Sequence, residues 1–142
     1  MGTELPESFE AGTVSTPLIA GLDASIRWVK QVGIRNINAY EAELATSLIE
    51  RLDTIPGSIL FETEMPPKNG IVLYQNKKIG VNELASALDE KSICTRSGFH
   101  CAPLAHQTLH TGEHGALRIS FGIFNTRKDI DRLYSILKKI CK

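Results

Sequence analysis

The order in which helical and strand-like apolar patterns follow one another limits the fold of this chain more than any other feature. Apolar residues recur at helical spacing in 16–33, 38–52, 82–89 and 126–140, and strand-like runs occupy 58–61, 71–74, 92–95 and 117–121. This order lacks the strict strand-helix alternation that produces a parallel sheet. The pattern therefore predicts an α+β fold, with a short, mainly antiparallel sheet packed against helices.

The limits of the first expected helix are marked by three residues. Thr16 and Pro17 are typical of an N-cap and a first helical proline, and Gly33 follows the last periodic residue. The apolar face of this helix is expected to hold Ile19, Leu22, Ile26 and Val29. Residues 1–15 show no periodicity and are expected to form an extended lead-in, so that residues 16–142 make a single domain.

Two further helices begin at patterns typical of a capping box, in which a polar cap residue is followed three positions later by an acidic side chain. Asn38 with Glu41 predicts the start of the second helix. Asn125-Thr126 with Asp129 predicts the start of the last one.

The composition is that of an ordinary globular domain of 142 residues, 42% hydrophobic and 23% charged. Sixteen basic residues balance sixteen acidic ones, which argues against nucleic-acid binding. No stretch approaches the roughly 20 apolar residues that cross a bilayer, and the first residues do not resemble a signal peptide. We therefore expect no membrane association and a cytoplasmic location. The odd number of cysteines, three without regular spacing, fits a reducing compartment.

Polar and reactive side chains are unusually dense between residues 94 and 118. They are Cys94, Arg96, His100, Cys101, His106, His110, His114 and Arg118. In the expected strand 117–121 every second residue is apolar, so Arg118 is predicted to point away from the core.

Cys101 allows three interpretations. A cysteine reacts as its thiolate, and Arg96 and His100 are near enough in sequence to lower a thiol pKa that is about 8.5 when unperturbed. Alternatively, Cys101 is a small packed residue, with the histidines in a solvated loop.

The third interpretation is a zinc site, which would use the ligands Cys101, His106, His110 and His114. Against it, the cluster has no pair of cysteines two to four residues apart, and glycines interrupt the helix that a histidine ladder needs. We therefore expect no metal at these residues and place His106, His110 and His114 in a solvated loop.

Three segments carry a resemblance to a known family. Residues 9–13 read Phe-Glu-Ala-Gly-Thr, residues 96–103 read Arg-Ser-Gly-Phe-His-Cys-Ala-Pro, and residues 117–126 contain Arg-Ile-Ser followed by Phe-Asn-Thr. In this order they resemble signatures in the C-terminal part of class V aminotransferases, the pyridoxal-phosphate enzymes that include cysteine desulfurases and selenocysteine lyases. The middle segment is similar to that of SUF-type, or group II, desulfurases. The resemblance implies the small C-terminal domain of a fold-type-I enzyme.

The resemblance also implies roles for individual residues. Cys101 matches the cysteine that takes sulfur from L-cysteine as a persulfide while L-alanine is released, and His100 would tune the thiolate or orient its loop. Arg118 matches the arginine that binds the substrate carboxylate, and Arg96 would add a second contact or support the cysteine loop.

The first signature matches residues that contact the cofactor from the other subunit of a homodimer. Thr13, with Gly12 before it, would reach the phosphate of pyridoxal phosphate held by that subunit. In SUF-type enzymes a sulfur-acceptor protein then takes the persulfide sulfur.

The family binds its cofactor through a lysine in a Ser-x-His-Lys motif of a large N-terminal domain, and no lysine of this chain follows a histidine. The large domain is therefore expected to be absent, and the isolated chain is expected neither to bind the cofactor covalently nor to catalyse desulfuration. Two alternatives remain: a class V enzyme acting on another amino acid, with Cys101 incidental, or a non-catalytic Cys/His module that binds zinc or a protein.

Overall fold

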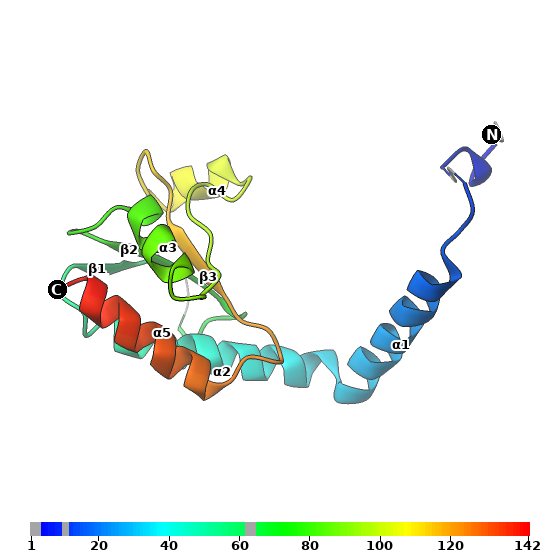
Figure 1. The fold of residues 1–142 in the computed structure, drawn as a ribbon, viewed down its shortest axis with the longest axis horizontal. Helices are drawn as coiled ribbons and strands as arrows, with labels where there is room; N and C mark the ends of the chain where they lie inside the picture. The colour runs from blue at the N-terminus through cyan, green and yellow to red at the C-terminus, as the bar shows by residue number, and fades with distance from the viewer. Residues whose placement is uncertain (1–3, 10–11, 62–64) are drawn as a thin grey trace. The chain divides into compact units, whose positions relative to one another are not determined.

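A computed structural model of the protein describes residues 4–9, 12–61 and 65–142 (Figure 1). The chain divides into two compact units, residues 1–34 and residues 35–142. No helix within the described ranges is sufficiently long and apolar to cross a bilayer.

The first unit contains a 3₁₀ turn, η1 (Glu7–Phe9), and the helix α1 (Thr16–Val32). The expected end is confirmed, because Gly33 has a φ of 90° and donates its N–H to the carbonyl of Val29 at 2.9 Å. The expected cap is wrong by one residue: Ser15 occupies the N-cap position and Thr16 is already helical.

The apolar face predicted for α1 is exposed. Ile19, Leu22 and Ile26 keep 52%, 60% and 46% of their surface accessible, and no residue of α1 is buried. The helical spacing therefore predicted the helix correctly. It did not predict burial, because the apolar face is exposed among the described residues.

The helix α2 (Ile34–Leu52) follows α1 after a single residue. The capping box expected at Asn38 and Glu41 is wrong, because both residues lie inside α2. Gly33 ends the preceding helix so sharply that the chain is helical again from Ile34, and a capping sequence has no orphan amide to satisfy within a formed helix.

A three-stranded antiparallel sheet lies at the centre of the second unit, with strands β1 (Ser58–Leu60), β2 (Ile71–Asn76) and β3 (Leu117–Ser120) in the order β1-β2-β3. The predicted α+β class is confirmed. Arg118 pairs with Leu73 in the register between β2 and β3.

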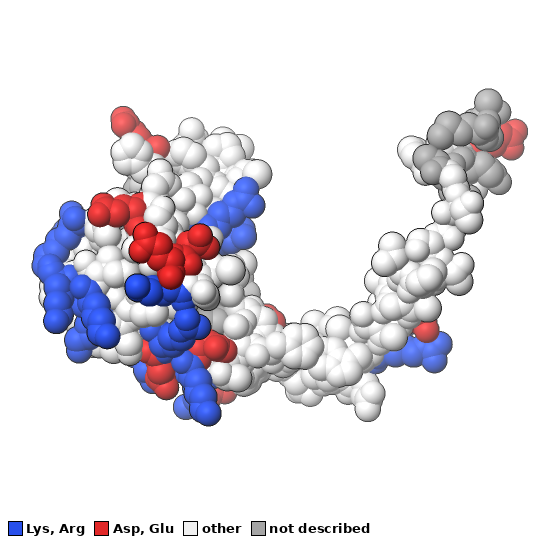
Figure 2. Space-filling model, viewed as in Figure 1, with Lys and Arg blue, Asp and Glu red and all other residues white. Residues whose placement is uncertain are grey.

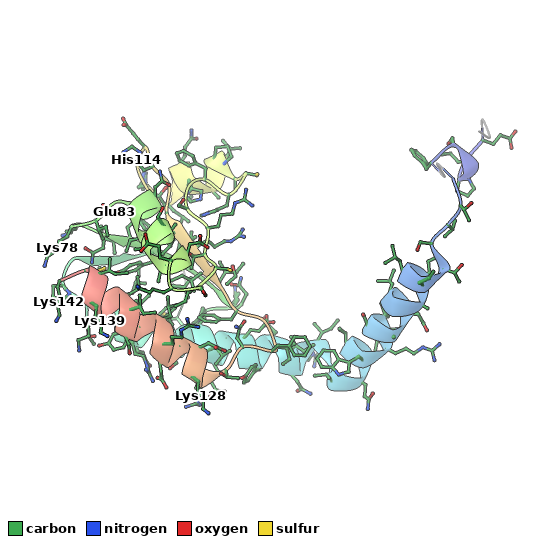
Figure 3. All side chains as sticks on the ribbon, in the orientation of Figure 1. Lys78, Glu83, His114, Lys128, Lys139 and Lys142 are labelled. Carbon is green, nitrogen blue, oxygen red and sulfur yellow. The ribbon has the colours of Figure 1, made fainter. Side chains whose placement is uncertain are left out.

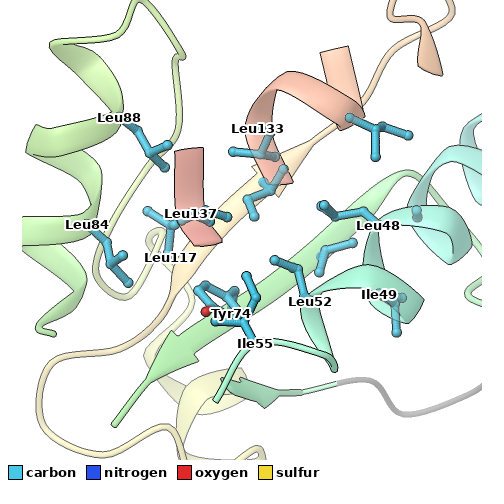
Figure 4. Close-up of a cluster of buried hydrophobic side chains, with 14 of the residues drawn as sticks. Leu48, Ile49, Leu52, Ile55, Tyr74, Leu84, Leu88, Leu117, Leu133 and Leu137 are labelled. Atoms are coloured by element: carbon cyan, nitrogen blue, oxygen red, sulfur yellow. The ribbon is translucent and has the colours of Figure 1, made fainter. Parts of the chain in front are cut away.

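Alternate residues of the sheet give it one buried face. Val72, Tyr74, Leu117 and Ile119 are at most 3% exposed. They share the core with α2, α3 (Val81–Asp89) and α5 (Arg127–Ile140), as Figure 4 shows. Core residues of the helices are Leu44, Leu48, Leu52, Leu84, Leu88, Ile130, Leu133 and Leu137. Arg118 has the opposite parity to Leu117 and Ile119, so it lies on the other face of β3, as predicted.

The helices α2 and α5 lie side by side (Figure 1). Two ion pairs join their exposed edges, Glu43 with Arg127 and Arg51 with Asp131. The hydroxyl of Tyr40 on α2 also donates to the carbonyl of Asn125 at 2.7 Å, just before α5. On the face that Figure 2 shows, acidic and basic side chains are interspersed over this unit.

The capping box expected at the start of α5 is confirmed. The Thr126 N–H donates to Oδ2 of Asp129 at 2.7 Å, and the Thr126 hydroxyl lies 3.1 Å from the same oxygen. These bonds hold the pKa of Asp129 below its ordinary value of 3.8.

Replacing Asp129 by alanine is expected to lower the free energy of unfolding by about 0.3–1.5 kcal/mol at neutral pH. Because the folded-state pKa is lowered, the stabilisation is present above pH 3.8 and is lost as pH falls through the lowered pKa. Urea titrations of the chain and of Asp129→Ala should therefore differ at pH 7 and converge in strong acid. An Asp129→Ala variant as stable as the parent at pH 7 would contradict the capping role.

Candidate active site

Cys101 lies at the second central position of a tight turn. The Ala102 N–H donates to the carbonyl of Phe99 at 2.8 Å, and the two residues between them, His100 and Cys101, have φ values of 53° and 60°. Positive φ at both central positions is the geometry of a type I′ turn, which normally uses glycine or asparagine. Non-glycine residues in this region store strain, and such residues are concentrated at functional sites. The turn leaves Cys101 exposed.

The turn is attached to the sheet by two pairs of backbone hydrogen bonds. Arg96 and Arg118 exchange N–H···O bonds of 3.2 and 2.7 Å, and Gly98 and Ala116 exchange two of 3.1 Å. The segment leading to Cys101 therefore runs antiparallel beside β3 and its preceding residues. A short strand was expected at residues 92–95, and this prediction is wrong: only Arg96, one residue later, forms an isolated bridge.

The same pairing brings the two arginines together. Arg96 and Arg118 line a cavity of about 200 Å³ with Cys94, Thr95 and Ser120. In the part of the chain that the structure describes, the buried Nε of Arg118 and the buried hydroxyl of Thr95 have no hydrogen-bond partner. A guanidinium with a free donor beside a second guanidinium is suited to a planar anion such as a carboxylate.

His100 connects the turn to this arginine pair. Its Nε2 lies 3.0 Å from the carbonyl oxygen of Arg96, and its Nδ1 lies 3.1 Å from Nε2 of His106. Burial lowers the pKa of His100 below its ordinary value of 6.5, and the charges of Arg118, His106 and Arg96 lower it further, against the opposing effect of the Arg96 carbonyl. The lowered pKa favours the uncharged form of His100 at neutral pH.

The expectation of a solvated loop is correct for His110 and His114 but wrong for His106. His110 and His114 are exposed, whereas His106 is 4% exposed and lies in a helix that the sequence did not predict, α4 (Pro103–Thr108). The ring of Phe99 packs edge-on against His106 at 5.5 Å, which removes the imidazole from solvent.

The described residues do not support the zinc interpretation. Nowhere among them do three or more His, Cys, Asp or Glu side chains form a group placed to hold a metal ion. His100 and His106 point their ring nitrogens at each other instead.

All three cysteines are free thiols, but they differ in environment. Cys141 is buried beside the Tyr74 hydroxyl at 3.7 Å, and burial raises the pKa of its thiol. Cys94 and Cys101 are exposed, and Cys94 lines the arginine cavity. Only Cys101 combines exposure with a strained turn.

Gly12 and Thr13 belong to the first unit, whereas the turn and the arginines belong to the second. Gly12 has a φ of 109° and Thr13 is exposed just before α1. Residues 10 and 11 of the same signature lie outside the described residues. Residues 1–34 and 35–142 are separate units, so the assignment of Gly12 and Thr13 to the cofactor stays a prediction.

Sequence reasoning missed two residues that shape the site. Gln75 on β2 donates through Nε2 to the carbonyls of Thr111 and Gly115, at 2.7 and 2.5 Å, and so fixes the loop after α4. Its signal in the sequence is a polar residue at the parity opposite to Val72 and Tyr74. Thr111 is buried and bonded to His106, which no local pattern indicates.

Comparison with known proteins places this arrangement in a family. The model of the aminotransferase class-V family matches residues 2–133, and the chain belongs to this family. It is 33% identical over 139 residues to a probable cysteine desulfurase of Staphylococcus aureus (strain Mu50), and 36% identical over 138 residues to one of Xylella fastidiosa (strain Temecula1). These matches cover 96% of this chain and 32% of each relative, so the chain spans about a third of their length.

Solved structures agree with this assignment. The apo cysteine desulfurase from Thermococcus onnurineus NA1 superposes with a TM-score of 0.82 at 29% identity, over 98% of this chain and 34% of that one. A cysteine desulfurase from Escherichia coli gives a TM-score of 0.77 at 27% identity, over 94% and 32%.

Membership of this family implies pyridoxal phosphate, held through a lysine, and the described residues do not fit that part of the task. No lysine lines the arginine cavity. None lines the second hollow, beside the cysteine turn, whose walls include Phe99, Pro103 and His106. Figure 3 places Lys78, Lys139 and Lys142 around the C-terminal end of α5 and Lys128 at its start. The described part of this chain offers an anion subsite and a thiol, without a lysine beside either of them.

Proposed function

We propose that this chain is the small C-terminal domain, over residues 16–142, of a cytoplasmic, homodimeric cysteine desulfurase or selenocysteine lyase of the SUF type. A large domain supplies the lysine and pyridoxal phosphate, and Thr13 with Gly12 contacts the cofactor phosphate of the partner subunit. A sulfur-acceptor protein receives the product sulfur. The names of the relatives and the shared fold support this proposal.

One observation carries the proposal: an exposed thiol in a strained turn is tied to a pair of arginines with an unused donor. Arg118, helped by Arg96, binds the carboxylate of L-cysteine, and Cys101 takes the substrate sulfur. The net change balances, because a thiol and cysteine give a persulfide and alanine. A class V enzyme acting on another amino acid needs the arginines but has no use for the thiol, so Cys101 favours the desulfurase.

The geometry supports an orienting role for His100. Both of its ring nitrogens have partners within the domain, the Arg96 carbonyl and His106. No ring nitrogen remains to take a proton from Cys101 while these bonds persist. His100 therefore positions the turn rather than acting as a base.

The test is a single turnover with the full-length protein that contains this chain, loaded with pyridoxal phosphate. After L-cysteine is added, we expect L-alanine in solution and the mass of one added sulfur on the peptide that contains Cys101. Alanine release with an unmodified Cys101 peptide would favour an incidental thiol, and stoichiometric zinc in the purified protein would favour a binding module.

A further inference from the structure

A continuous chain of hydrogen bonds runs from the loop after α4 to the arginine bridge. The Thr111 hydroxyl lies 2.9 Å from Nδ1 of His106, Nε2 of His106 lies 3.1 Å from Nδ1 of His100, and Nε2 of His100 lies 3.0 Å from the Arg96 carbonyl oxygen. Four residues, up to 15 positions apart in the sequence, are thus joined: Thr111, His106 and His100 through their side chains, and Arg96 through its backbone carbonyl.

The Arg96 carbonyl, at one end of this series of hydrogen bonds, determines which atom donates in both hydrogen bonds of the His100 ring. A carbonyl oxygen only accepts, so Nε2 of His100 carries the proton, and Nδ1 of the uncharged ring accepts. Nε2 of His106 must then donate to it, and at a pH above the histidine range, where the His106 ring carries one proton, Nδ1 of His106 accepts from the Thr111 hydroxyl. That hydroxyl also lies 3.5 Å from the His106 carbonyl, but its single proton serves the shorter contact of 2.9 Å.

We infer that His106 is a positioning residue: with Thr111 it holds His100 as the neutral Nε2–H tautomer and thereby holds the left-handed turn that presents Cys101. The consequence for sulfur transfer rests on the proposed function. The inferred tautomer of His100 and its effect on the turn do not depend on the proposed function.

His106 is placed for this task by packing as well as by hydrogen bonds. Its imidazole is 4% exposed, lies in α4 and meets the ring of Phe99 edge-on, so it cannot follow His100 if that ring rotates. His100 and Cys101 occupy the two strained positions of the turn. The hydrogen bond from His106, which lies in α4, holds His100 in its position. A neutral His100 also suits its surroundings, because Arg96, Arg118 and His106 all disfavour a charge there.

The test uses ring-nitrogen NMR of the full 142-residue chain at a pH above the histidine range, with amide exchange measured in parallel. We expect Nε2 to be the protonated nitrogen of both His100 and His106. In His106→Ala only the Arg96 carbonyl is left to favour the Nε2–H form, so His100 should populate more of the Nδ1–H tautomer than in the parent chain, and the Ala102 amide, which closes the turn, should exchange about three- to tenfold faster. His106→Gln should restore the parent behaviour, because its amide nitrogen donates at the place of Nε2.

Two further variants separate positioning from a general loss of structure. His114→Ala removes an exposed histidine of the same loop (Figure 3) and should change neither the His100 tautomer nor the Ala102 exchange. Thr111→Val keeps the shape of the side chain but removes the hydroxyl, so His106 loses one of the two partners that favour its Nε2–H tautomer and should populate more of the Nδ1–H form than in the parent chain. This test stays available if His106→Ala fails to fold.

An Nδ1–H tautomer of His100 in the parent chain overturns the inference, and so does a His106→Ala variant with unchanged tautomer and exchange. Neither result depends on desulfuration. Conversely, full-length protein that forms no persulfide on Cys101 refutes the proposed function while the tautomers remain as stated.

Discussion

Replacing Cys101 by alanine in the full-length protein is expected to reduce alanine release from L-cysteine by about three orders of magnitude or more. The reason is chemical: the substrate sulfur needs an acceptor, and loss of a nucleophile commonly abolishes the step that depends on it. Alanine at position 101 leaves the arginine cavity intact, so binding of the substrate carboxylate should persist. We therefore expect kcat to fall with little change in the apparent affinity for cysteine.

Cys94 provides the matched control, because it is the other exposed thiol and is seven positions away in the sequence. Cys94→Ala should still form persulfide on Cys101 and should release alanine at least about 100-fold faster than Cys101→Ala. Steady-state alanine assays and peptide mass spectrometry measure both effects. Equal turnover in the parent and in Cys101→Ala excludes Cys101 as the sulfur acceptor.

Gly115→Ala is expected to disrupt the cysteine turn although it lies 14 positions from the thiol in the sequence. A methyl group at Gly115 would lie 2.2 Å from the carbonyl oxygen of Gly98 and 2.4 Å from its carbonyl carbon. These are backbone atoms of the pair that Gly98 forms with Ala116, so the two segments must separate. The expected result is displacement of the turn together with a loss of stability.

Gly112 separates the clash from the backbone strain. Both glycines have positive φ, 76° at Gly112 and 65° at Gly115, but a methyl group at Gly112 meets nothing within 4 Å. Each substitution should cost about 1–2 kcal/mol of conformational strain, and Gly115→Ala about 1–3 kcal/mol more for the overlap. Urea denaturation gives the difference, and amide shifts of Arg96 and Gly98 report the displacement. Equal stability of the two variants would show that the loop absorbs the methyl group without separating from Gly98.

Much of the fold was accessible from the sequence because it rests on local patterns. The helices α1, α3 and α5 were predicted from apolar periodicity and their flanking residues, and the alternation in β3 placed Arg118 on the face opposite the core. The start of α2 could not be predicted in this way, because a capping pattern at Asn38 does not show whether the preceding residues are already helical.

The site was predictable only as a set of residue types. Its residues come from segments brought together by the bridge between Arg96 and Arg118, a pairing 22 positions apart that no local pattern encodes. For the same reason the burial of His106 escaped prediction. Its environment is made by Phe99 and Thr111, and the six residues of α4 are too few for a periodic signal.

The attachment of the cysteine turn has a consequence for how the domain opens. Residues 96–115 are joined to the rest of the second unit mainly by the backbone pairs Arg96–Arg118 and Gly98–Ala116, by the side chain of Gln75 and by the bond from the Ser97 hydroxyl to Asn82, whereas the helices α2, α3 and α5 share a continuous apolar core. Local opening requires less free energy where fewer buried contacts must be broken. We therefore expect the segment that carries the thiol to be a folding unit of low stability, which opens and re-forms while the core of the domain stays folded.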